Sequence, residues 1–326
     1  MPDVILRVED LHTHFNAKDG LIKAVNGVDL ELKRGQILGL VGESGCGKSV
    51  TALSILRLVP YPGKIVSGSV YFEDRDLSKI SNEELRQIRG NEVSMIFQDP
   101  LMGLNPVIEI GEQVMELLAA HMTASKSELR AKTIEVLRSV GLPDPVRVTK
   151  QYPFQLSGGM AQRVMIAIAM ALNPKVLIAD EPTSSLDVTI QAQILDQILK
   201  MKRNLGTSVL LITHDLGVIA QVADEVAIIY AGAIVEYGSV GDVFSKPMHP
   251  YTRALLNALP RIDRPFEELQ SIPGSPPNPM DLLDECPFIP RCNKALSICR
   301  TSSWPKLQEP EPDHSVACYN PVRYDW

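Results

Sequence analysis

The chain has 326 residues, a formal net charge of −7 and 45% hydrophobic residues, enough for one large domain or two smaller ones. The acidic balance argues against a nucleic-acid-binding surface, which usually carries a basic stripe, so no nucleic-acid partner is expected. The N-terminal MPDVILRVEDLHTHF holds no long apolar run and is not a secretory signal. The apolar stretches, such as residues 164–172, are too short to span a bilayer. We therefore expect a cytosolic chain in which disulfides do not persist.

The expected elements alternate between buried strands and helices. ILGLV (37–41) predicts a strand ending in a Gly-rich turn, and a helical pattern follows over residues 48–59. VLIAD (176–180) and SVLLIT (208–213) predict two more buried strands, and residues 189–205 predict a helix between them. This alternation indicates an α/β fold with a mostly parallel sheet covered by helices on both faces.

Other parts of the chain have a different character. The middle, from about residue 98 to 175, predicts a helical insertion with amphipathic helices over 111–122 and 125–141. Residues 226–238 predict a hairpin that turns near Gly232. From Pro247 onward, proline and turn residues predict a loop-dominated extension that does not continue the core.

Residues 42–49 read GESGCGKS, the spacing of a phosphate-binding loop between a strand and a helix. Its glycines let backbone N–H groups curl around an anion, and the helix N-terminus adds its dipole. Lys48 can reach the β and γ phosphates, and Ser49 can bind Mg²⁺. The alternative is a flexible loop that only caps a helix. The residues expected to line a nucleotide here are Gly42, Ser44, Gly45, Cys46, Gly47, Lys48, Ser49 and Val50, with no redox role for Cys46.

Asp180 and Glu181 follow the predicted strand at 176–180. In a doubly wound fold the carboxyl ends of the strands face the ligand crevice. Asp180 is expected to hold the Mg²⁺ shell, and Glu181 to orient or deprotonate the attacking water. On its own, the pair also fits an exposed acidic turn after a core strand.

Further motifs resemble those of the ATP-binding-cassette ATPases, from about residue 4 to 245. LSGGMAQR (156–163) resembles the signature sequence, with Met160 where glutamine is usual, and SSLD (184–187) resembles the D-loop. Gln98, His214 and Phe15 resemble the glutamine before the helical subdomain, the switch histidine and the adenine-stacking aromatic. Taken singly, these three also fit a loop residue, a strand-end histidine and a core ring. Because Met160 leaves the Ser157–Gly159 phosphate contacts intact, no loss of activity is expected from it.

The resemblance implies a P-loop NTPase fold, with a RecA-like core, an antiparallel β subdomain and a helical subdomain. The core and β subdomain would span 1–97 and 176–246, the helical subdomain 98–175, and a C-terminal extension 247–326. Glu181, His214 and Gln98 would be catalytic, while Ser49, Gln98 and Asp180 would hold Mg²⁺. The further nucleotide contacts implied are Phe15, Gln98, Ser157, Gly158, Gly159, Asp180 and Asp187.

The signature stretch has its own physics. Ser157 can cap a helix that begins near Gly159, and that N-terminus can bind an anion. The resemblance implies that this anion belongs to the nucleotide of a second ATPase subunit, so that two ATP molecules lie between head-to-tail cassettes. Closing and opening of the pair would then drive a partner through differential contacts.

The C-terminal tail indicates which kind of ATP-binding cassette the chain resembles. HPYTRALLNALP (249–260), the proline-rich stretch and the clustered cysteines resemble the ATPase subunits of dipeptide and oligopeptide importers. The resemblance implies a second ATPase subunit, two membrane permease subunits and an extracytoplasmic binding protein, with this chain peripheral on the cytoplasmic face of the membrane. The alternatives are a nickel or other small-solute importer of the same subfamily, a soluble ABC ATPase in DNA repair or translation, and a redox or metal sensor.

Four of the five cysteines lie in the tail, at 286, 292, 299 and 318. Four thiolates suit a tetrahedral Zn²⁺ site or an iron–sulfur cluster, and their spacing leaves the metal open. Disulfides or free thiols are the remaining alternative. The resemblance implies a [4Fe–4S] cluster bound by Cys286, Cys292, Cys299 and Cys318, as a structural staple or, in a sharper hypothesis, as a redox regulator of transport.

Overall fold

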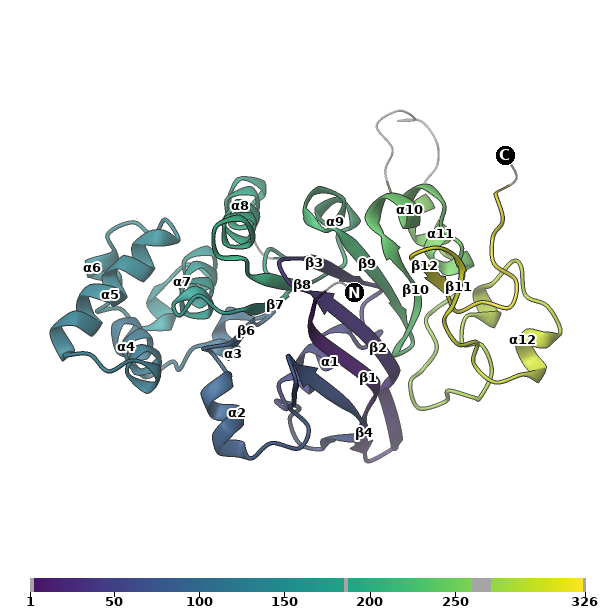
Figure 1. Ribbon diagram of the computed structural model, residues 1–326, viewed down its shortest axis with the longest axis horizontal. Helices are drawn as coiled ribbons and strands as arrows, with labels where there is room; N and C mark the ends of the chain where they lie inside the picture. Colours follow the sequence, from purple (N-terminus) through teal and green to yellow (C-terminus); the bar gives the residue numbers. More distant parts are fainter. Residues whose placement is uncertain (1–2, 185–186, 260–270, 325–326) are drawn as a thin grey trace. The chain divides into compact units, whose positions relative to one another are not determined.

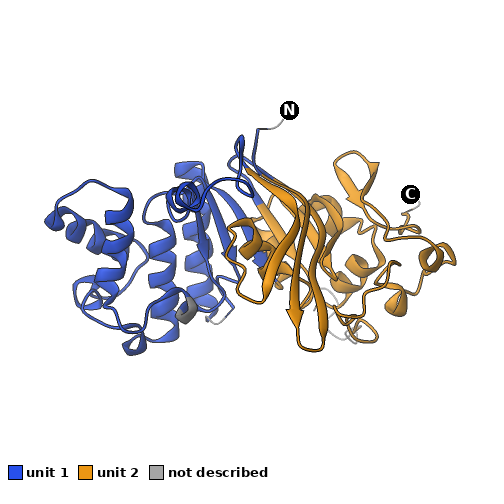
Figure 2. Ribbon diagram, turned by 90° about the horizontal axis from the view of Figure 1, so that it is seen from below, with its two compact units in different colours: residues 1–6, 32–37, 72–213 blue, residues 7–31, 38–71, 214–326 orange. Residues whose placement is uncertain are grey.

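The computed structural model describes residues 3–184, 187–259 and 271–324. The chain divides into two units, each assembled from separate stretches of sequence (Figure 2). The first unit comprises residues 1–6, 32–37 and 72–213, and the second comprises residues 7–31, 38–71 and 214–326. Within the described residues, no helix combines the length and the apolar character needed to cross a bilayer.

The first unit is built on parallel strands that are buried throughout. β7 (Val176–Asp180) pairs with β6 (Val93–Ile96) on one side and with β8 (Ser208–Thr213) on the other. Every residue of the three strands is buried, as expected for parallel strands covered on both faces. The strands predicted at 176–180 and 208–213 are therefore confirmed. β6 escapes prediction because four residues, VSMI, are too few to show a pattern.

The helices of the first unit begin at residues suited to capping. Ser81 and Ser125 each form a capping box with the glutamate three residues later, at the starts of α2 and α5. α7 packs against α3, α5 and β6, and Figure 1 shows α4, α5 and α6 gathered beside it. The two predicted amphipathic helices are α4 and α5. The bounds are β5 (Arg75–Asp76), α2 (Asn82–Ile88), α3 (Pro100–Gly103), α4 (Ile110–His121), α5 (Lys126–Ser139), α6 (Pro145–Val148), the 3₁₀ helix η1 (Pro153–Gln155), α7 (Gly158–Met170) and α8 (Val188–Leu205).

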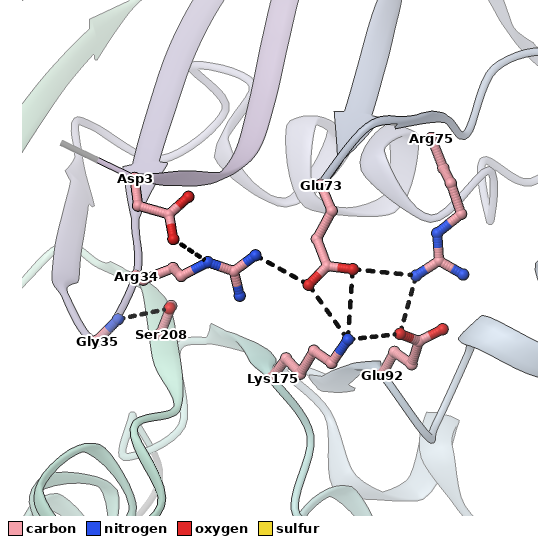
Figure 3. Close-up of polar contacts among 8 residues, drawn as sticks. All are labelled: Asp3, Arg34, Gly35, Glu73, Arg75, Glu92, Lys175 and Ser208. Atoms are coloured by element: carbon pink, nitrogen blue, oxygen red, sulfur yellow. Dashed lines mark hydrogen bonds and ion pairs between the residues drawn. The ribbon is translucent and has the colours of Figure 1, made fainter. Parts of the chain in front are cut away.

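An ion-pair network joins the starts of β6 and β7 (Figure 3). Glu73 accepts hydrogen bonds from Arg34 at 3.0 Å and from Lys175 at 3.2 Å. Glu92 accepts from Arg75 at 2.8 Å and from Lys175 at 3.0 Å. The hydrogen bond from Arg34 lowers the pKa of Glu73, and the one from Arg75 lowers the pKa of Glu92. The partly exposed pairs contribute little singly, but together they fix the end of β7 opposite Asp180.

The second unit holds one sheet formed around β1 and a second sheet that carries the hairpin. In the first, β1 (Val4–Ala17) lies between β2 (Gly20–Lys33) and β4 (Gly63–Phe72). In the second, β3 (Ile37–Val41) pairs in parallel with β9 (Glu225–Tyr230), which pairs antiparallel with β10 (Ala233–Ser239). The hairpin predicted near Gly232 is confirmed by the β9–β10 register. The helices are α1 (Lys48–Ile55), α9 (Leu216–Val222), α10 (Val240–Ser245), α11 (Pro250–Asn257), the 3₁₀ helix η2 (Ile289–Arg291) and α12 (Ile298–Thr301).

The C-terminal extension adds strands to this sheet, which corrects the prediction that it does not continue the core. β12 (His314–Val316) pairs antiparallel with β10 and with β11 (Gln308–Glu311). The fully buried carboxylate of Glu236 on β10 accepts hydrogen bonds from the backbone N–H groups of Met248 and His249 and contacts His314 Nε2 at 2.8 Å. A buried carboxylate requires such partners. Sequence patterns miss the pairing because β11 (QEPE) and β12 (HSV) are short and polar.

Candidate functional site

At two points of the Gly-rich loop between β3 and α1, only glycine fits. Gly47, which precedes α1, has φ of +105°, and a Cβ there would lie 2.3 Å from the carbonyl oxygen of Ala24. A Cβ on Gly42 would lie 2.3 Å from the carbonyl oxygen of Ile229. A side chain at either position would force the backbone to move. These glycines therefore fix how tightly the loop packs onto its support.

Lys48 closes the loop from the inside. It is the first residue of α1, it is buried, and its Nζ donates to the carbonyl oxygens of Gly42 at 2.7 Å and Glu43 at 2.9 Å. Ser49 and Val50 follow on α1 and are half-buried, whereas Ser44 and Gly45 are exposed. The ammonium group and the N-terminus of α1 concentrate positive potential within the loop, which suits it to a phosphate chain.

The turn of the β9–β10 hairpin supports the phosphate loop through backbone hydrogen bonds. Gly232 N–H donates to the carbonyl oxygen of Cys46 at 2.9 Å, and the carbonyl oxygen of Gly232 accepts from Asn26 N–H at 2.8 Å. The Cys46 side chain is buried, and burial raises the pKa of its thiol. Cys46 therefore acts here as a small packing residue in the protonated form.

Two predicted nucleotide contacts lie in the same unit as the loop. Phe15 is half-buried on β1, and its ring lies so close to Gly63 that a Cβ there would be 2.5 Å from ring Cε1. His214 is exposed immediately after the last residue of β8. The next residue, Asp215, caps α9 by accepting from Gly217 N–H at 2.8 Å, which fixes the chain direction just after His214.

In the first unit, two carboxylates stand at the carboxyl end of β7. Asp180 is 3% exposed and Glu181 is 8% exposed. Glu181 has φ of +46°, in the left-handed region, and its N–H donates to the carbonyl oxygen of Ile212 at 2.9 Å. A non-glycine residue in this conformation is strained and is held there by its surroundings, as often occurs at functional positions.

The signature stretch opens α7, as the sequence predicts. Ser157 caps the helix by accepting from Met160 N–H at 3.3 Å, and Gly158 is exposed. Gln162, which sequence reasoning missed, is 1% exposed and donates to the carbonyl oxygen of Pro182 at 2.7 Å. This bond ties the helix behind the signature to the turn after Glu181. The sequence hints at this contact only through a glutamine that stands among the mostly apolar residues of the helix.

The remaining predicted residues of the first unit lie on connecting segments. Gln98 is exposed two positions after β6. Asp187 caps α8 by accepting from Ile190 N–H at 3.0 Å. Ser185 and Leu186 of the predicted D-loop lie outside the described residues. The predicted residues thus form two sets, one around the phosphate loop in the second unit and one at the end of β7 and start of α7 in the first.

Similarity to known proteins decides the family. Residues 25–184 match the ABC transporter family, and residues 235–299 match the oligopeptide/dipeptide transporter C-terminal region. The oligopeptide transport ATP-binding protein AppD of Bacillus subtilis (strain 168) is 48% identical, over 97% of this chain and 96% of AppD. The dipeptide transport ATP-binding protein DppD of Escherichia coli (strain K12) is 43% identical, over 98% of this chain and 97% of DppD. The chain belongs to the ATP-binding subunits of ABC transporters of the oligopeptide and dipeptide type.

Solved structures support the same assignment. The dimeric ATP-binding cassette MJ0796, in a post-hydrolysis state bound to ADP and Pi, is 28% identical with a TM-score of 0.66, covering 72% of this chain and 98% of that one. As an ABC transporter ATP-binding subunit, the chain is an ATPase coupled to transport. The P-loop NTPase fold expected from its motifs is therefore confirmed.

The four C-terminal cysteines of this ABC subunit gather in one part of the second unit. Cys286 N–H donates to the carbonyl oxygen of Cys299 at 3.3 Å. Burial first, with a smaller contribution from nearby cysteines, raises the pKa of Cys286 to about 11 and that of Cys318 to about 12. Backbone N–H groups lie 3.4 Å from the sulfurs of Cys292 and Cys318 and 3.5 Å from that of Cys299.

The cysteines do not form a ready-made cage for a single ion. Among the residues that the structure describes, no three His, Cys, Asp or Glu side chains are placed to hold a metal ion. The metal site predicted at the four cysteines therefore stays a prediction.

Sequence reasoning also missed a set of residues around Glu43, the second residue of the phosphate loop. Arg291 pairs with its carboxylate, and Tyr251 contacts its backbone N–H. Tyr251 belongs to the quoted HPY stretch, but that stretch signals only the kind of transporter. Arg291 carries no sequence signal, because its partner lies 248 residues away.

Proposed function

We propose that this chain hydrolyses ATP to power the import of dipeptides or oligopeptides, bound to the cytoplasmic face of the membrane. The observation that carries the proposal is the identity of 43–49% to oligopeptide, dipeptide and peptide transport ATP-binding proteins along 93–98% of this chain. The match to the C-terminal region of oligopeptide/dipeptide transporters supports it, because that region lies outside the nucleotide-binding motifs.

In this proposal the residues of the two sets have different roles in ATP hydrolysis. The phosphate loop wraps the phosphate chain, and Lys48 turns its ammonium from the loop carbonyls toward the β and γ phosphates. Ser49, Gln98 and Asp180 would hold Mg²⁺, which neutralises charge on the phosphates when bound. Glu181 positions or deprotonates the attacking water and His214 contacts the γ-phosphate, while Phe15 stacks on the adenine.

A second ATPase subunit completes each site. Ser157, Gly158 and Gly159 present the N-terminus of α7 and Asp187 presents the start of α8 to the nucleotide held by the partner. The solved dimers of MJ0796 support a paired arrangement. Two permease subunits and an extracytoplasmic binding protein complete the transporter. The functional domains in this scheme are 1–97 with 176–246, then 98–175, then 247–326.

Within this proposal, Cys286, Cys292, Cys299 and Cys318 bind a [4Fe–4S] cluster. Such a cluster takes one thiolate per iron, so its ligands stand further apart than four ligands at ~2.3 Å from one zinc ion. It therefore does not need the close cage that the described residues lack. Backbone N–H groups directed at three of the sulfurs suit thiolate ligands of a cluster. When bound, it crosslinks the extension.

The cluster is tested by metal analysis and absorption spectroscopy of protein purified without oxygen. Brown protein with about four irons and four sulfides per chain is expected. A Cys318→Ser variant should lose the colour. Colourless protein that contains zinc would overturn the assignment.

The transport function is tested by purifying the tagged chain from its native membranes with its integral membrane subunits. After reconstitution into proteoliposomes with the binding protein, dipeptides should stimulate ATP hydrolysis and accumulate inside. A Glu181→Gln complex should bind ATP without transport. Stimulation by nickel but not by peptides would overturn the peptide assignment.

A further inference from the structure

Glu43 of the phosphate loop is held at all of its polar groups. Its N–H donates to the hydroxyl oxygen of Tyr251 at 2.9 Å, and its carbonyl oxygen accepts from Lys48 Nζ at 2.9 Å. Its carboxylate forms two parallel bonds with Arg291, from Nη1 to Oε2 at 2.6 Å and from Nη2 to Oε1 at 2.9 Å. Two of these partners, Tyr251 and Arg291, come from the C-terminal region and not from the cassette motifs.

Arg291 is built into the fold as a fixed group. Its side chain is 3% exposed, against 23% for Glu43. Nε donates to the carbonyl oxygen of Pro273 at 3.0 Å, and Nη1 also donates to the hydroxyl of Tyr230 at 3.3 Å. The guanidinium lies 5.9 Å from the ring centre of Tyr230 and 6.0 Å from that of Phe288. A bidentate arginine held on this many sides defines both the position and the orientation of its carboxylate partner.

An aromatic cluster fixes Tyr251 and Arg291 relative to each other. Tyr251 packs on Tyr230 with ring centres 4.6 Å apart, and Phe288 lies 5.3 Å from Tyr230 and 5.5 Å from Tyr251. Phe288 stands three residues before Arg291, whose N–H donates to the carbonyl oxygen of Phe288 at 3.0 Å. Tyr251 and Arg291 therefore reach Glu43 from one packed unit.

We propose that Arg291, with Tyr251, positions the phosphate loop through Glu43, so that the C-terminal extension sets the affinity of this subunit for nucleotide. This inference rests on the proposed role of the loop in phosphate binding. Two physical effects follow from the pairing. The guanidinium fixes the backbone at the first turn of the loop, where Lys48 also binds. It also neutralises a carboxylate that would otherwise repel the phosphates.

The test measures the dissociation constant for ADP by calorimetry, since ADP needs neither hydrolysis nor a partner subunit. Arg291→Gln should weaken ADP binding about 10-fold, because it leaves the Glu43 carboxylate charged and without the two guanidinium N–H groups that donate to it. Arg291→Lys should show a smaller loss, since one ammonium cannot make both bonds. Removing both charges, in Glu43→Gln with Arg291→Gln, should restore affinity to within about 3-fold of wild type. Arg300→Gln, at an exposed residue of the same extension, is the matched control and should leave affinity unchanged.

Lys48→Ala separates this inference from the function on which it rests. If Lys48→Ala leaves ADP affinity unchanged, the loop is not the phosphate site and both fail. If Lys48→Ala weakens ADP binding but Arg291→Gln and Arg291→Lys do not, the positioning role alone is wrong. A lowered melting temperature with unchanged ADP affinity in the Arg291 variants would likewise show that the pair only stabilises the fold.

Discussion

Glu181 combines two costly properties, because this acidic residue is only 8% exposed and its backbone has φ of +46°. A strained backbone conformation persists only where the surrounding structure holds it in place, and such positions cluster at functional sites. We expect Glu181→Gln to keep ATP affinity within about twofold and to slow hydrolysis by at least about 100-fold, the usual contribution of a positioned base. Calorimetric ATP binding and phosphate release assays measure the two effects.

The control for Glu181 is Met160→Gln, which inserts the residue usual at that point of the signature. Met160 takes part in the helix cap through its backbone N–H, which donates to Ser157 Oγ. Hydrolysis should therefore stay close to that of wild type. Near-normal turnover in Glu181→Gln would instead remove Glu181 from its role as base.

At the residue scale, a site formed by neighbouring residues of the sequence could be predicted. A contact between residues far apart in the sequence could not. GESGCGKS shows its glycines, lysine and serine within eight neighbouring positions, so their joint role can be inferred from spacing. Glu43 lies in the same stretch, but its partner Arg291 is brought to it only by the packing of the extension. No local pattern indicates a pair that tertiary structure creates.

At the scale of elements, α11 depends on a histidine that must stay neutral. His249 Nδ1 accepts from Tyr251 N–H at 3.0 Å, which caps α11, and burial lowers the pKa of His249 to about 4. The unfolded chain, with an ordinary histidine pKa near 6.5, binds a proton below that pH that the folded chain does not. The free energy of unfolding should therefore fall as pH drops from 6.5 to 4, by about 3 kcal/mol from this residue.

His249→Asn tests this dependence, because asparagine can still cap a helix but does not titrate. Urea denaturation between pH 4 and 7 should give a shallower loss of stability for the variant than for wild type. The negative charge of Glu236 favours protonated His249, but the effect of burial is larger. Parallel curves for the two proteins would contradict the assignment.

The strands show why element prediction succeeded in one place and failed in another. β7 and β8 are continuous apolar runs, so burial on both faces is visible in the sequence. β1 is half-buried, and its burial changes phase across Asp10, from Leu6 and Val8 to Leu11 and Thr13. Asp10 has φ of +45°, so the alternation slips by one residue there. A broken period hides a long strand from pattern analysis.

At the scale of the whole molecule, we propose that the single chain carries parts of two different nucleotide sites. In this proposal the phosphate loop binds the chain's own nucleotide, and the N-terminus of α7 at Ser157 binds the nucleotide of a second subunit. We therefore expect ATP hydrolysis per chain to rise with protein concentration until pairs predominate, and to be minimal in dilute monomer. Phosphate release measured over a dilution series, with sedimentation at each concentration, tests this.

Mixing two inactive variants shows whether the site is shared. Lys48→Ala removes the phosphate grip and Ser157→Arg blocks the signature, so each alone should be inactive. An equal mixture of the two should recover roughly a quarter of the wild-type rate, because half of the pairs are mixed and one of their two sites is complete. No recovery in pairs that sedimentation shows to be mixed, or full hydrolysis by a monomer, would contradict a site built from two subunits.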